Sequence, residues 1–508
     1  MRSLHFLIGA IIFSFSLKNV KAAWGFDEKE ANADDSPVRF LSTGDDALIA
    51  DNYIGAVKYY RHGISLISDT TDVMISLSLH VNLGTALSSL GDDDGAVVSY
   101  IAAIAMHDLY STKQEVSKDE RNVAAQAAFF LGMTYQDMEN IPPVKAADAY
   151  ALAASLDSRH WSALANLGSV LHDKIRDYPG AVKSYGAAFA ILTERPEDGS
   201  EPTDPPPNPR PVLSQLQYRI GLSINLKPDQ KCAFDNDPTK VVSCEEVAAR
   251  AFSLAVKYDE SNAAAKHMLA TITADATLER ASNTYVTDLF DKYASNFEHS
   301  LVDELGYDGF ARLRGGFDRA FGGSDNVPIF QTVLDAGCGT GLVGEQFRNI
   351  SQHLIGVDLS ENIIEEAKRA RPNLYDETVV GDVITTLQKA KKKISLIVAA
   401  DSLIYFGDLE PLFSAMVIGL ETDGYLAFTL ENASPESQES LSQIRPDWRW
   451  QLTASGRFAH RKEYVLFVAK QHFLKLLHYE SLDSFRYEKG SPVNGHLFIM
   501  RKNISQEL

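Results

Sequence analysis

The sequence predicts a two-part protein: an all-α array of paired helices, followed by a doubly wound domain with helices on both faces of a mainly parallel sheet. Three observations support this fold class. A pattern of small and aromatic residues recurs at helical spacing through residues 38–275. In residues 280–505, apolar runs of strand length alternate with stretches of helix length. A glycine-rich turn follows the first of these strands.

The composition is that of a folded, acidic protein. Its 508 residues are enough for several domains, and 45% are hydrophobic and 23% charged, close to the averages for globular chains. Asp and Glu (68) outnumber Lys and Arg (48), so we expect no sequence-independent binding to nucleic acid. Three cysteines exclude a disulfide-built scaffold and a four-cysteine zinc site, and no metal site is predicted.

The N-terminus carries the pattern of a secretory signal. Arg2 and His5 precede an apolar run over residues 6–17, which is followed by small residues. The run is shorter than the roughly 20 residues of a membrane span, so we expect a signal peptide over residues 1–22. The alternative is an uncleaved N-terminal anchor. We therefore expect the chain in the secretory pathway, in the ER lumen or outside the cell, with no later membrane span.

Five copies of one pattern make up the helical array. In each copy, one helix carries a glycine, and the next carries a small residue, an aromatic residue four positions later and a small residue three after that. The copies are Gly44 with Ala56, Tyr60 and Gly63; Gly84 with Ala96, Tyr100 and Ala103; Gly132 with Ala146, Tyr150 and Ala153; Gly168 with Ala181, Tyr185 and Ala188; and Gly221 with Ala248, Phe252 and Ala255. Small residues let antiparallel helices approach closely, while the aromatic rings fill the remaining space.

This pattern resembles the tetratricopeptide repeat, which has about 34 residues per unit. The resemblance implies a concave face that binds a protein or peptide partner. An array that only scaffolds or dimerises is the alternative. Two insertions, residues 202–212 and 226–243, interrupt the last copy. Cys232 and Cys244 flank the second insertion and could close a small loop in an oxidising lumen.

The candidate ligand site begins at an apolar strand that runs into the sequence D-x-G-x-G-x-G. Its members are Asp335, Gly337, Gly339 and Gly341. Glycines allow the backbone to bend sharply and a ligand to approach it closely. Asp358 ends the next strand about twenty residues later, where an acid accepts hydrogen bonds from ribose hydroxyls.

The acid ahead of the turn distinguishes this motif from a dinucleotide site. Asp335 would repel a pyrophosphate at the following helix start, and suits a ligand with a cationic or amino-bearing group instead. The combination resembles motif I of the class I S-adenosylmethionine-dependent methyltransferases. The resemblance implies S-adenosylmethionine as the cofactor.

Further strands follow in the order that the resemblance implies. Gly381 and Asp382 end a third strand, where an acid contacts the adenine. Asp401 follows the all-apolar strand 394–400 and is a candidate catalytic residue, with a helix N-cap as its alternative role. Residues 474–488 and 494–501 are expected to form an antiparallel edge.

Parts of the chain resemble a narrower family, the predicted methyltransferases that carry tetratricopeptide repeats. The segments concerned are residues 285–301, 401–412, 456–464 and 492–495. The resemblance implies that Phe290 and Tyr293 belong to a lid over the cofactor, although on pattern alone they fit a core. Glu298 and Ser300 stand where the family tends to have Asp and His.

Outside the cofactor motifs, His460 with Arg457 and Tyr464 forms the one candidate acid–base group. A structural histidine is the alternative. The sequence thus predicts a methyltransferase that acts on an N or O nucleophile of a protein or small molecule, with repeats that recruit a partner. Two other interpretations stay open: a catalytically inert repeat scaffold for protein–protein interaction, and a small-molecule enzyme whose repeats only dimerise.

Overall fold

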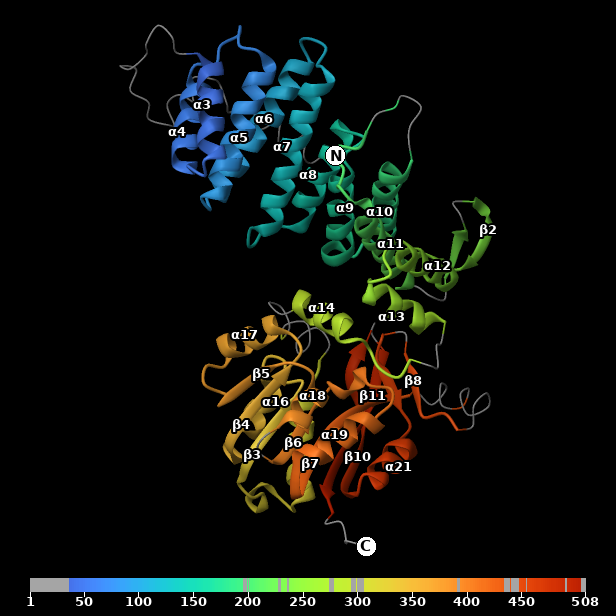
Figure 1. The fold of residues 1–508 in the computed structure, drawn as a ribbon. Coiled ribbons are helices and arrows are strands. Elements are labelled where there is room, and N and C mark those ends of the chain that lie inside the picture. The colour runs from blue at the N-terminus through green and yellow to red at the C-terminus, as the bar shows by residue number, and fades with distance from the viewer. Residues whose placement is uncertain are drawn as a thin grey trace. The chain divides into compact units, whose positions relative to one another are not determined.

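The structure is a computed structural model (Figure 1), and it divides the chain into two compact units, Met1–Glu260 and Ser261–Leu508. It describes residues 36–194, 199, 201–226, 230–234, 237–273, 278–293, 298, 306–390, 393–433, 439, 447–453, 455–488 and 491–503. The expected signal peptide over residues 1–22 lies outside this part. Among the residues described, no helix combines the length and the apolar character needed to cross a membrane.

The first unit is built from helices that pack in antiparallel pairs (Figure 1). The pairs are α3 (Pro37–Ile49) with α4 (Tyr53–Ser65), α5 (Val73–Ser89) with α6 (Asp93–Ser111), α7 (Lys118–Asp137) with α8 (Pro143–Leu156), α9 (Trp161–Val170) with α10 (Tyr178–Thr193), and α11 (Pro209–Asn225) with α12 (Cys244–Tyr258). A single π-helical turn, Leu171–Ile175, extends α9. The N-terminal unit is therefore helical, as the sequence predicts.

One contact recurs within every pair: the glycine of the first helix lies against the aromatic ring of the second. A Cβ atom added at each glycine would come within 2.4 to 2.7 Å of that ring. The contacts join Gly44 to Tyr60, Gly84 to Tyr100, Gly132 to Tyr150, Gly168 to Tyr185 and Gly221 to Phe252. All five rings are buried. The sequence pattern thus corresponds to a repeated packing contact in which only glycine leaves room for the ring.

The second helix of a pair also begins in a repeated way. Asn52, Asp92 and Asp177 are N-caps whose side chains accept a hydrogen bond from the backbone N–H three residues later. Such caps satisfy a donor that the helix itself leaves unpaired, and each is worth about 1 kcal/mol.

The two insertions have defined structures at their ends. In the Pro-rich segment, expected to be an extended break, α11 already begins at Pro209, because proline is tolerated in the first turn of a helix. The second insertion contains the antiparallel strands β1 (Lys231–Phe234) and β2 (Asp237–Ser243). Cys232 and Cys244 form a disulfide that ties this hairpin to the start of α12.

The second unit begins at Ser261 and so includes a helix that the sequence assigns to the repeat array over residues 38–275. α13 (Ala263–Ile272) belongs to this unit, because its His267 ring stacks on Tyr285 of α14 (Asn283–Tyr293) at 4.0 Å. The Nε2 atom of His267 also lies 2.7 Å from the carbonyl oxygen of Gly456. A helix that the sequence assigns to the repeats therefore packs on the α/β unit.

A nine-stranded Rossmann-like sheet forms the centre of the second unit (Figure 1). Its strands are β3 (Phe330–Ala336), β4 (Ser351–Asp358), β5 (Glu377–Val380), β6 (Ile394–Ala399), β7 (Leu420–Asn432), β8 (Trp450–Leu452), β9 (Phe458–His460), β10 (Leu474–Glu488) and β11 (Ser491–Lys502). Its helices are α15 (Gly309–Ala320), α16 (Leu342–Phe347), α17 (Glu361–Ala370), α18 (Val383–Lys389), α19 (Glu410–Gly419) and α21 (Lys462–Gln471). Short 3₁₀ turns lie at Ser324–Asn326, Arg348–Ile350 and Leu403–Tyr405.

The main path of the sheet has the order β10-β11-β7-β6-β3-β4-β5. The strands from β7 to β5 are parallel, and β10 and β11 form the expected antiparallel edge. The order reverses between β3 and β6, which is the place where ligands bind in open α/β sheets. The sequence did not reveal β8 and β9; β9 runs parallel to the end of β7.

Two hydrophobic cores of this unit lie on opposite faces of the sheet. Alternate residues of the fully buried strand β6 belong to different cores: Ile397 and Ala399 to one, Leu396 and Val398 to the other. A strand that is covered on both faces needs an uninterrupted apolar run, which explains the sequence 394–400.

Candidate functional site

The glycine-rich turn connects β3 to α16 and requires glycine at specific positions. Gly337, Gly339 and Gly341 have φ values of +72°, +53° and +99°, a region that residues with a Cβ atom rarely adopt. At Gly337 a Cβ would also lie 2.4 Å from the Cβ of Ser402. The N–H groups of Gly337 and Cys338 both donate to the carbonyl oxygen of Val357, at 2.8 and 3.0 Å. The turn is therefore held against the end of the neighbouring strand β4.

A cavity opens beside this turn, at the carboxyl ends of β3, β4 and β6. Its lining includes Ala336 from the end of β3, Asp358 from the end of β4 and Ala400 just after β6. Six of the predicted cofactor-binding residues line it, namely Phe290, Gly337, Gly339, Asp358, Gly381 and Asp382. Asp401 lines it as well. Gly341 adjoins the cavity through its neighbour Leu342.

Asp358 has the position that the sequence predicts for a sugar-binding acid. Its Oδ2 accepts a hydrogen bond from the N–H of Gly339 at 3.0 Å, and its Oδ1 accepts one from Ser360 at 3.1 Å. Burial raises the pKa of this carboxyl above its usual value, while the backbone hydrogen bonds from Ser360 and Gly339 oppose the shift. The carboxylate thus faces the cavity and at the same time fixes the turn.

Asp335, the acid ahead of the turn, occupies a different place from the one inferred. Its side chain is completely buried and is not among the cavity-lining residues. Tyr375 donates a hydrogen bond to its Oδ2 at 2.7 Å. Burial raises the pKa of Asp335 to about 7, against the opposing effect of hydrogen bonds from Tyr375 and the Gly344 backbone. The structure therefore places Asp335 behind the turn, where it supports the backbone.

Asp382 follows the end of β5 by two residues and caps α18. Its Oδ1 accepts a hydrogen bond from the N–H of Thr385 at 3.0 Å, and its Oδ2 pairs with Arg280. Burial opposes ionisation, but the hydrogen bonds from Arg280 and Thr385 hold the pKa of this carboxyl below its usual range. The guanidinium of Arg280 lies 4.3 Å from the centre of the Phe406 ring. Arg280 lines the cavity, and no sequence motif marked it.

Helix α14 contributes one side of the site. Phe290 lines the cavity and meets Tyr405 edge-on, with ring centres 5.8 Å apart. Ser360, the N-cap of α17, donates its hydroxyl to Asp291 of α14. Tyr293 is the last residue of α14, and its side chain lies outside the described part of the structure. Phe290 therefore lines the cavity, and the lid over the cofactor stays a prediction.

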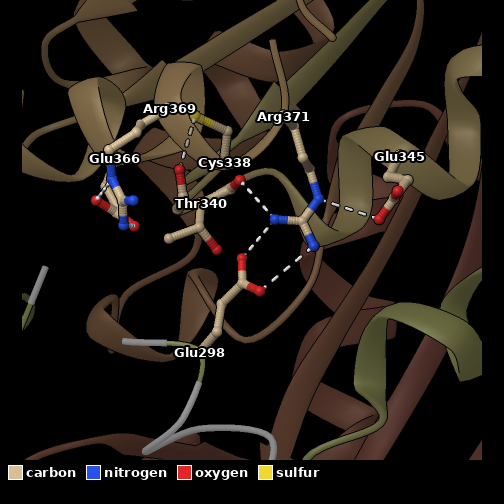
Figure 2. A network of polar contacts seen from close by, with 8 residues as sticks. Glu298, Cys338, Thr340, Glu345, Glu366, Arg369 and Arg371 are labelled. Carbon is tan, nitrogen blue, oxygen red and sulfur yellow. Dashed lines mark hydrogen bonds and ion pairs between the residues drawn. The ribbon is translucent and has the colours of Figure 1, made fainter. Parts of the chain in front are cut away.

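A network of charges fixes the outer side of the glycine-rich turn (Figure 2). Arg371 donates to the carbonyl oxygen of Thr340 at 3.2 Å and to Glu345 of α16 at 3.0 Å, and it pairs with Glu298. Burial opposes ionisation of Glu298, but hydrogen bonds from Arg371 and Thr340 hold the pKa of its carboxyl below the usual range. Arg371 thus joins the turn, the following helix and Glu298.

The predicted acid–base residues, His460 and Tyr464, are buried against the loop at residues 407–409. The His460 side chain is completely buried, and its Nε2 donates to the carbonyl oxygen of Gly407 at 3.1 Å. Burial lowers the pKa of His460 to about 4, so it is neutral near pH 7. Tyr464 donates to Asp408 at 2.8 Å and accepts from the N–H of Leu409 at 2.9 Å. Neither residue lines the cavity, and both hold the loop that leads into α19.

Asp401 is the predicted catalytic residue that the structure brings to the cavity. It follows β6 and has a positive φ of 55°, an unusual conformation for a residue with a side chain. Its carboxylate pairs with Arg486 of β10, whose side chain is completely buried. Asp401 does not cap a helix here, because the 3₁₀ turn that follows begins at Leu403 without a side-chain cap.

Comparisons with known proteins support a methyltransferase domain in the second unit. Residues 333–424 match the family described as "Methyltransferase domain". The segment runs from the start of the glycine-rich motif to β7, and includes Asp358, Asp382 and Asp401.

No group of three or more His, Cys, Asp or Glu side chains able to hold a metal ion occurs in the described part of the chain.

A curated relative and several solved structures are also similar. The malonyl-[acyl-carrier protein] O-methyltransferase of Bacillus anthracis is 26% identical over 165 residues, which are 32% of this chain and 53% of the relative. The chain thus spans about half the length of this relative. The N-methyltransferase NodS from Bradyrhizobium japonicum with S-adenosyl-L-homocysteine has a TM-score of 0.32 at 16% identity, covering 43% of this chain and 98% of NodS. Magnesium protoporphyrin IX methyltransferase from Synechocystis, with the same ligand, has a TM-score of 0.33 at 13% identity, covering 44% and 100%.

Proposed function

We propose that the chain is an S-adenosylmethionine-dependent methyltransferase that transfers a methyl group to an N or O nucleophile. One observation carries this proposal: the glycine-rich turn, Asp358 and Asp382 converge on one cavity at the point where the strand order reverses. Open backbone at the turn and acids at two neighbouring strand ends suit a ligand with an amino-acid part, a ribose and a base. The methyltransferase domain over residues 333–424 is consistent with this ligand.

The cavity has the features that this cofactor requires. Gly337 and Gly339 line the cavity, and because they lack a Cβ atom they would let the cofactor approach their backbone closely. Asp358 would accept hydrogen bonds from the ribose, Asp382 would face the adenine, and Phe290 and Tyr293 would cover it. The cofactor supplies a methyl group on a positively charged sulfur, so the protein mainly orients the acceptor and excludes water.

A binding experiment tests the proposal. Purified protein titrated with S-adenosylmethionine in a calorimeter should bind it, and Asp358→Ala should weaken binding at least tenfold, because both the ligand contact and the Gly339 contact are lost. Asp325→Ala, in the 3₁₀ turn Ser324–Asn326, is a surface control that should bind like wild type. Wild-type protein that does not bind the cofactor would rule out the proposal.

We further propose that the helical unit is a tetratricopeptide-like array that recruits a protein or peptide partner. The repeated glycine–aromatic contact in five helix pairs supports a stack of equivalent units. Peptide arrays probed with the full chain test the role, since recruitment requires some peptides to bind. No binding to any peptide, together with a stable dimer in sedimentation, would favour an array that only dimerises.

The proposed location is the secretory pathway, or an N-terminal anchor facing the same compartment. The Cys232–Cys244 disulfide supports this, because disulfides persist in oxidising compartments. A C-terminally tagged chain expressed in cells should lack its first ~22 residues and contain the disulfide in non-reducing mass spectrometry. An uncleaved, fully reduced cytosolic chain would contradict the proposal.

A further inference from the structure

A buried arginine from the far edge of the sheet reaches the wall of the cavity. Arg486 belongs to β10, and its side chain has no exposed surface. One nitrogen of its guanidinium pairs with Asp401 and the other pairs with Glu431 of β7. The side chains of Asp401 and Glu431 are 9% and 6% exposed. Two carboxylates therefore share one guanidinium, and one of them, Asp401, lines the cavity.

Local backbone irregularities direct these groups toward each other. The pairing of β10 with β11 shifts register between Leu482 and Arg486, and an irregularity of this kind re-aims side chains. Ser484, within the shift, has a φ of +48° and its N–H donates to the side chain of Asn494 at 3.1 Å. Asp401 itself has a positive φ and donates its N–H to Thr429 at 3.0 Å. Unfavourable conformations on both sides of an ion pair indicate that the pair has a specific role.

We propose that Arg486 is a positioning residue that fixes the Asp401 carboxylate in the cavity wall, and that this carboxylate receives the amino group of the methyl acceptor. The inference rests on the proposed function and names the acceptor class. A charge-paired carboxylate accepts hydrogen bonds and attracts a protonated amine, whereas it repels a carboxylate acceptor. Phe290, Tyr405 and Phe406 line the same cavity and suit an apolar group next to the amine.

The proton and electron balance of the step is simple. The acceptor enters as an ammonium, and Asp401 takes one of its protons, which leaves a lone pair on the nitrogen. The nitrogen then forms a bond to the methyl carbon as the carbon–sulfur bond breaks, and the electron pair of that bond stays on sulfur. Asp401 returns its proton to water when the methylated ammonium leaves.

Arg457 would support the opposite preference, in which the cavity binds an acceptor with a carboxylate group. It also lines the cavity and lies near Tyr405, where its charge opposes the burial that raises the pKa of that phenol. An acceptor carboxylate would be drawn to Arg457 instead of Asp401. Two probes of similar size and opposite charge separate these arrangements: 2-phenylethylamine and phenylacetate.

The experiment measures binding of each probe to protein saturated with S-adenosyl-L-homocysteine, by saturation-transfer NMR and calorimetry. Wild type should bind the amine at least tenfold more tightly than phenylacetate. Asp401→Asn, which keeps the shape, should weaken amine binding at least tenfold and remove the preference. Arg486→Lys should weaken it severalfold, because lysine keeps the charge but not the fork that holds two carboxylates. In both variants the affinity for S-adenosyl-L-homocysteine should stay within threefold, which a general structural defect would not allow.

Arg319→Met is the matched control. Arg319 of α15 pairs at the surface with Glu480, which belongs to β10 like Arg486. It should bind both probes like wild type. Tighter binding of phenylacetate, or unchanged amine binding in Asp401→Asn, would overturn the inference. So would an equal loss of amine and S-adenosyl-L-homocysteine affinity in Asp401→Asn, which would assign the carboxylate to the cofactor. If wild type fails to bind S-adenosyl-L-homocysteine, the proposed function fails; an amine preference in the unloaded protein would still reveal the Asp401 subsite.

Discussion

Glycine has different roles in the two units of this chain. In the helical unit, Gly84 and its equivalents have ordinary helical conformations, and the missing side chain makes room for a buried ring. In the α/β unit, Gly337, Gly339 and Gly341 have positive φ values, and the missing side chain permits the backbone conformation itself. A glycine that creates space matters for stability, whereas a glycine that permits a turn matters for ligand binding. Substitutions in the two units should therefore affect different measurements.

The largest effect is expected at the turn. Gly337→Ala places a Cβ at a positive φ and 2.4 Å from Ser402, so the turn must move. We expect affinity for S-adenosyl-L-homocysteine to fall at least 100-fold in calorimetry, with a helical signal like that of wild type. Gly315→Ala in α15 is the control, since its Cβ would meet only the flexible end of Arg319. Near-normal affinity of Gly337→Ala would show that the turn does not form the ligand site.

A substitution in the helical unit should leave binding intact and lower stability. Gly84→Ala puts a Cβ 2.5 Å from the buried ring of Tyr100. Overpacking of this kind costs about 1–3 kcal/mol, more than alanine gains in helix propensity. Urea unfolding followed by circular dichroism should show the loss. Gly186→Ala, where a Cβ meets nothing within 4 Å, should instead gain about 0.5–1 kcal/mol. Equal stability of both variants would contradict the packing role.

The buried acid behind the turn should make stability depend on pH. The folded chain keeps the Asp335 proton up to about pH 7, whereas the unfolded chain releases it near its ordinary value of 3.8. Between these values the folded state binds more protons, so wild-type stability falls as pH rises. Asp335→Asn does not titrate, and its stability relative to wild type should improve by about 2 kcal/mol between about pH 5 and pH 7. A difference that does not change with pH would contradict the raised pKa.

The smallest effect is expected at the charged network of Figure 2. Arg371→Met removes the contacts to Glu298, Glu345 and the Thr340 carbonyl, so we expect ligand affinity to fall about three- to tenfold, a loss of about 1 kcal/mol. Arg369→Met is the matched control from the same segment, because the exposed Arg369 pairs only with its helix neighbour Glu366 among the contacts described. Identical affinities in the two variants would show that the network does not hold the turn.

The sequence predicted the parts of the fold that depend on continuous local patterns. The apolar run of β6, the glycine-rich turn and the repeated glycine–aromatic spacing each reflect a physical requirement that neighbouring residues express together. β8 and β9 were missed, because three-residue strands are too short for a periodic signal. His460 thus appeared as an isolated histidine, although it lies in β9 and holds a buried loop.

The contact partners at the site could not be read from the sequence. Arg280 and Asp382 are 102 positions apart, and Arg486 and Asp401 are 85 apart, so only the folded chain brings them together. The burial of Asp335 could be inferred from the sequence only weakly, from the alternation of side chains along β3. Alternation along β3 places Asp335 on the face of Val333, opposite Leu334 and Ala336, and hence in a core rather than in the cavity. A motif shows that such an acid is needed, and strand alternation shows which way it faces.

The β1–β2 hairpin has a practical consequence for engineering. It is inserted between α11 and α12, and yet Gly221 and Phe252 of those helices make the same contact as the pairs joined by short loops. Pairing of the helices is thus independent of the length of their connection, as the slow growth of loop-closure entropy with length allows. A fluorescent reporter grafted in place of the hairpin tip would mark the helical unit without disturbing its packing, and the Cys232–Cys244 bond would anchor the graft.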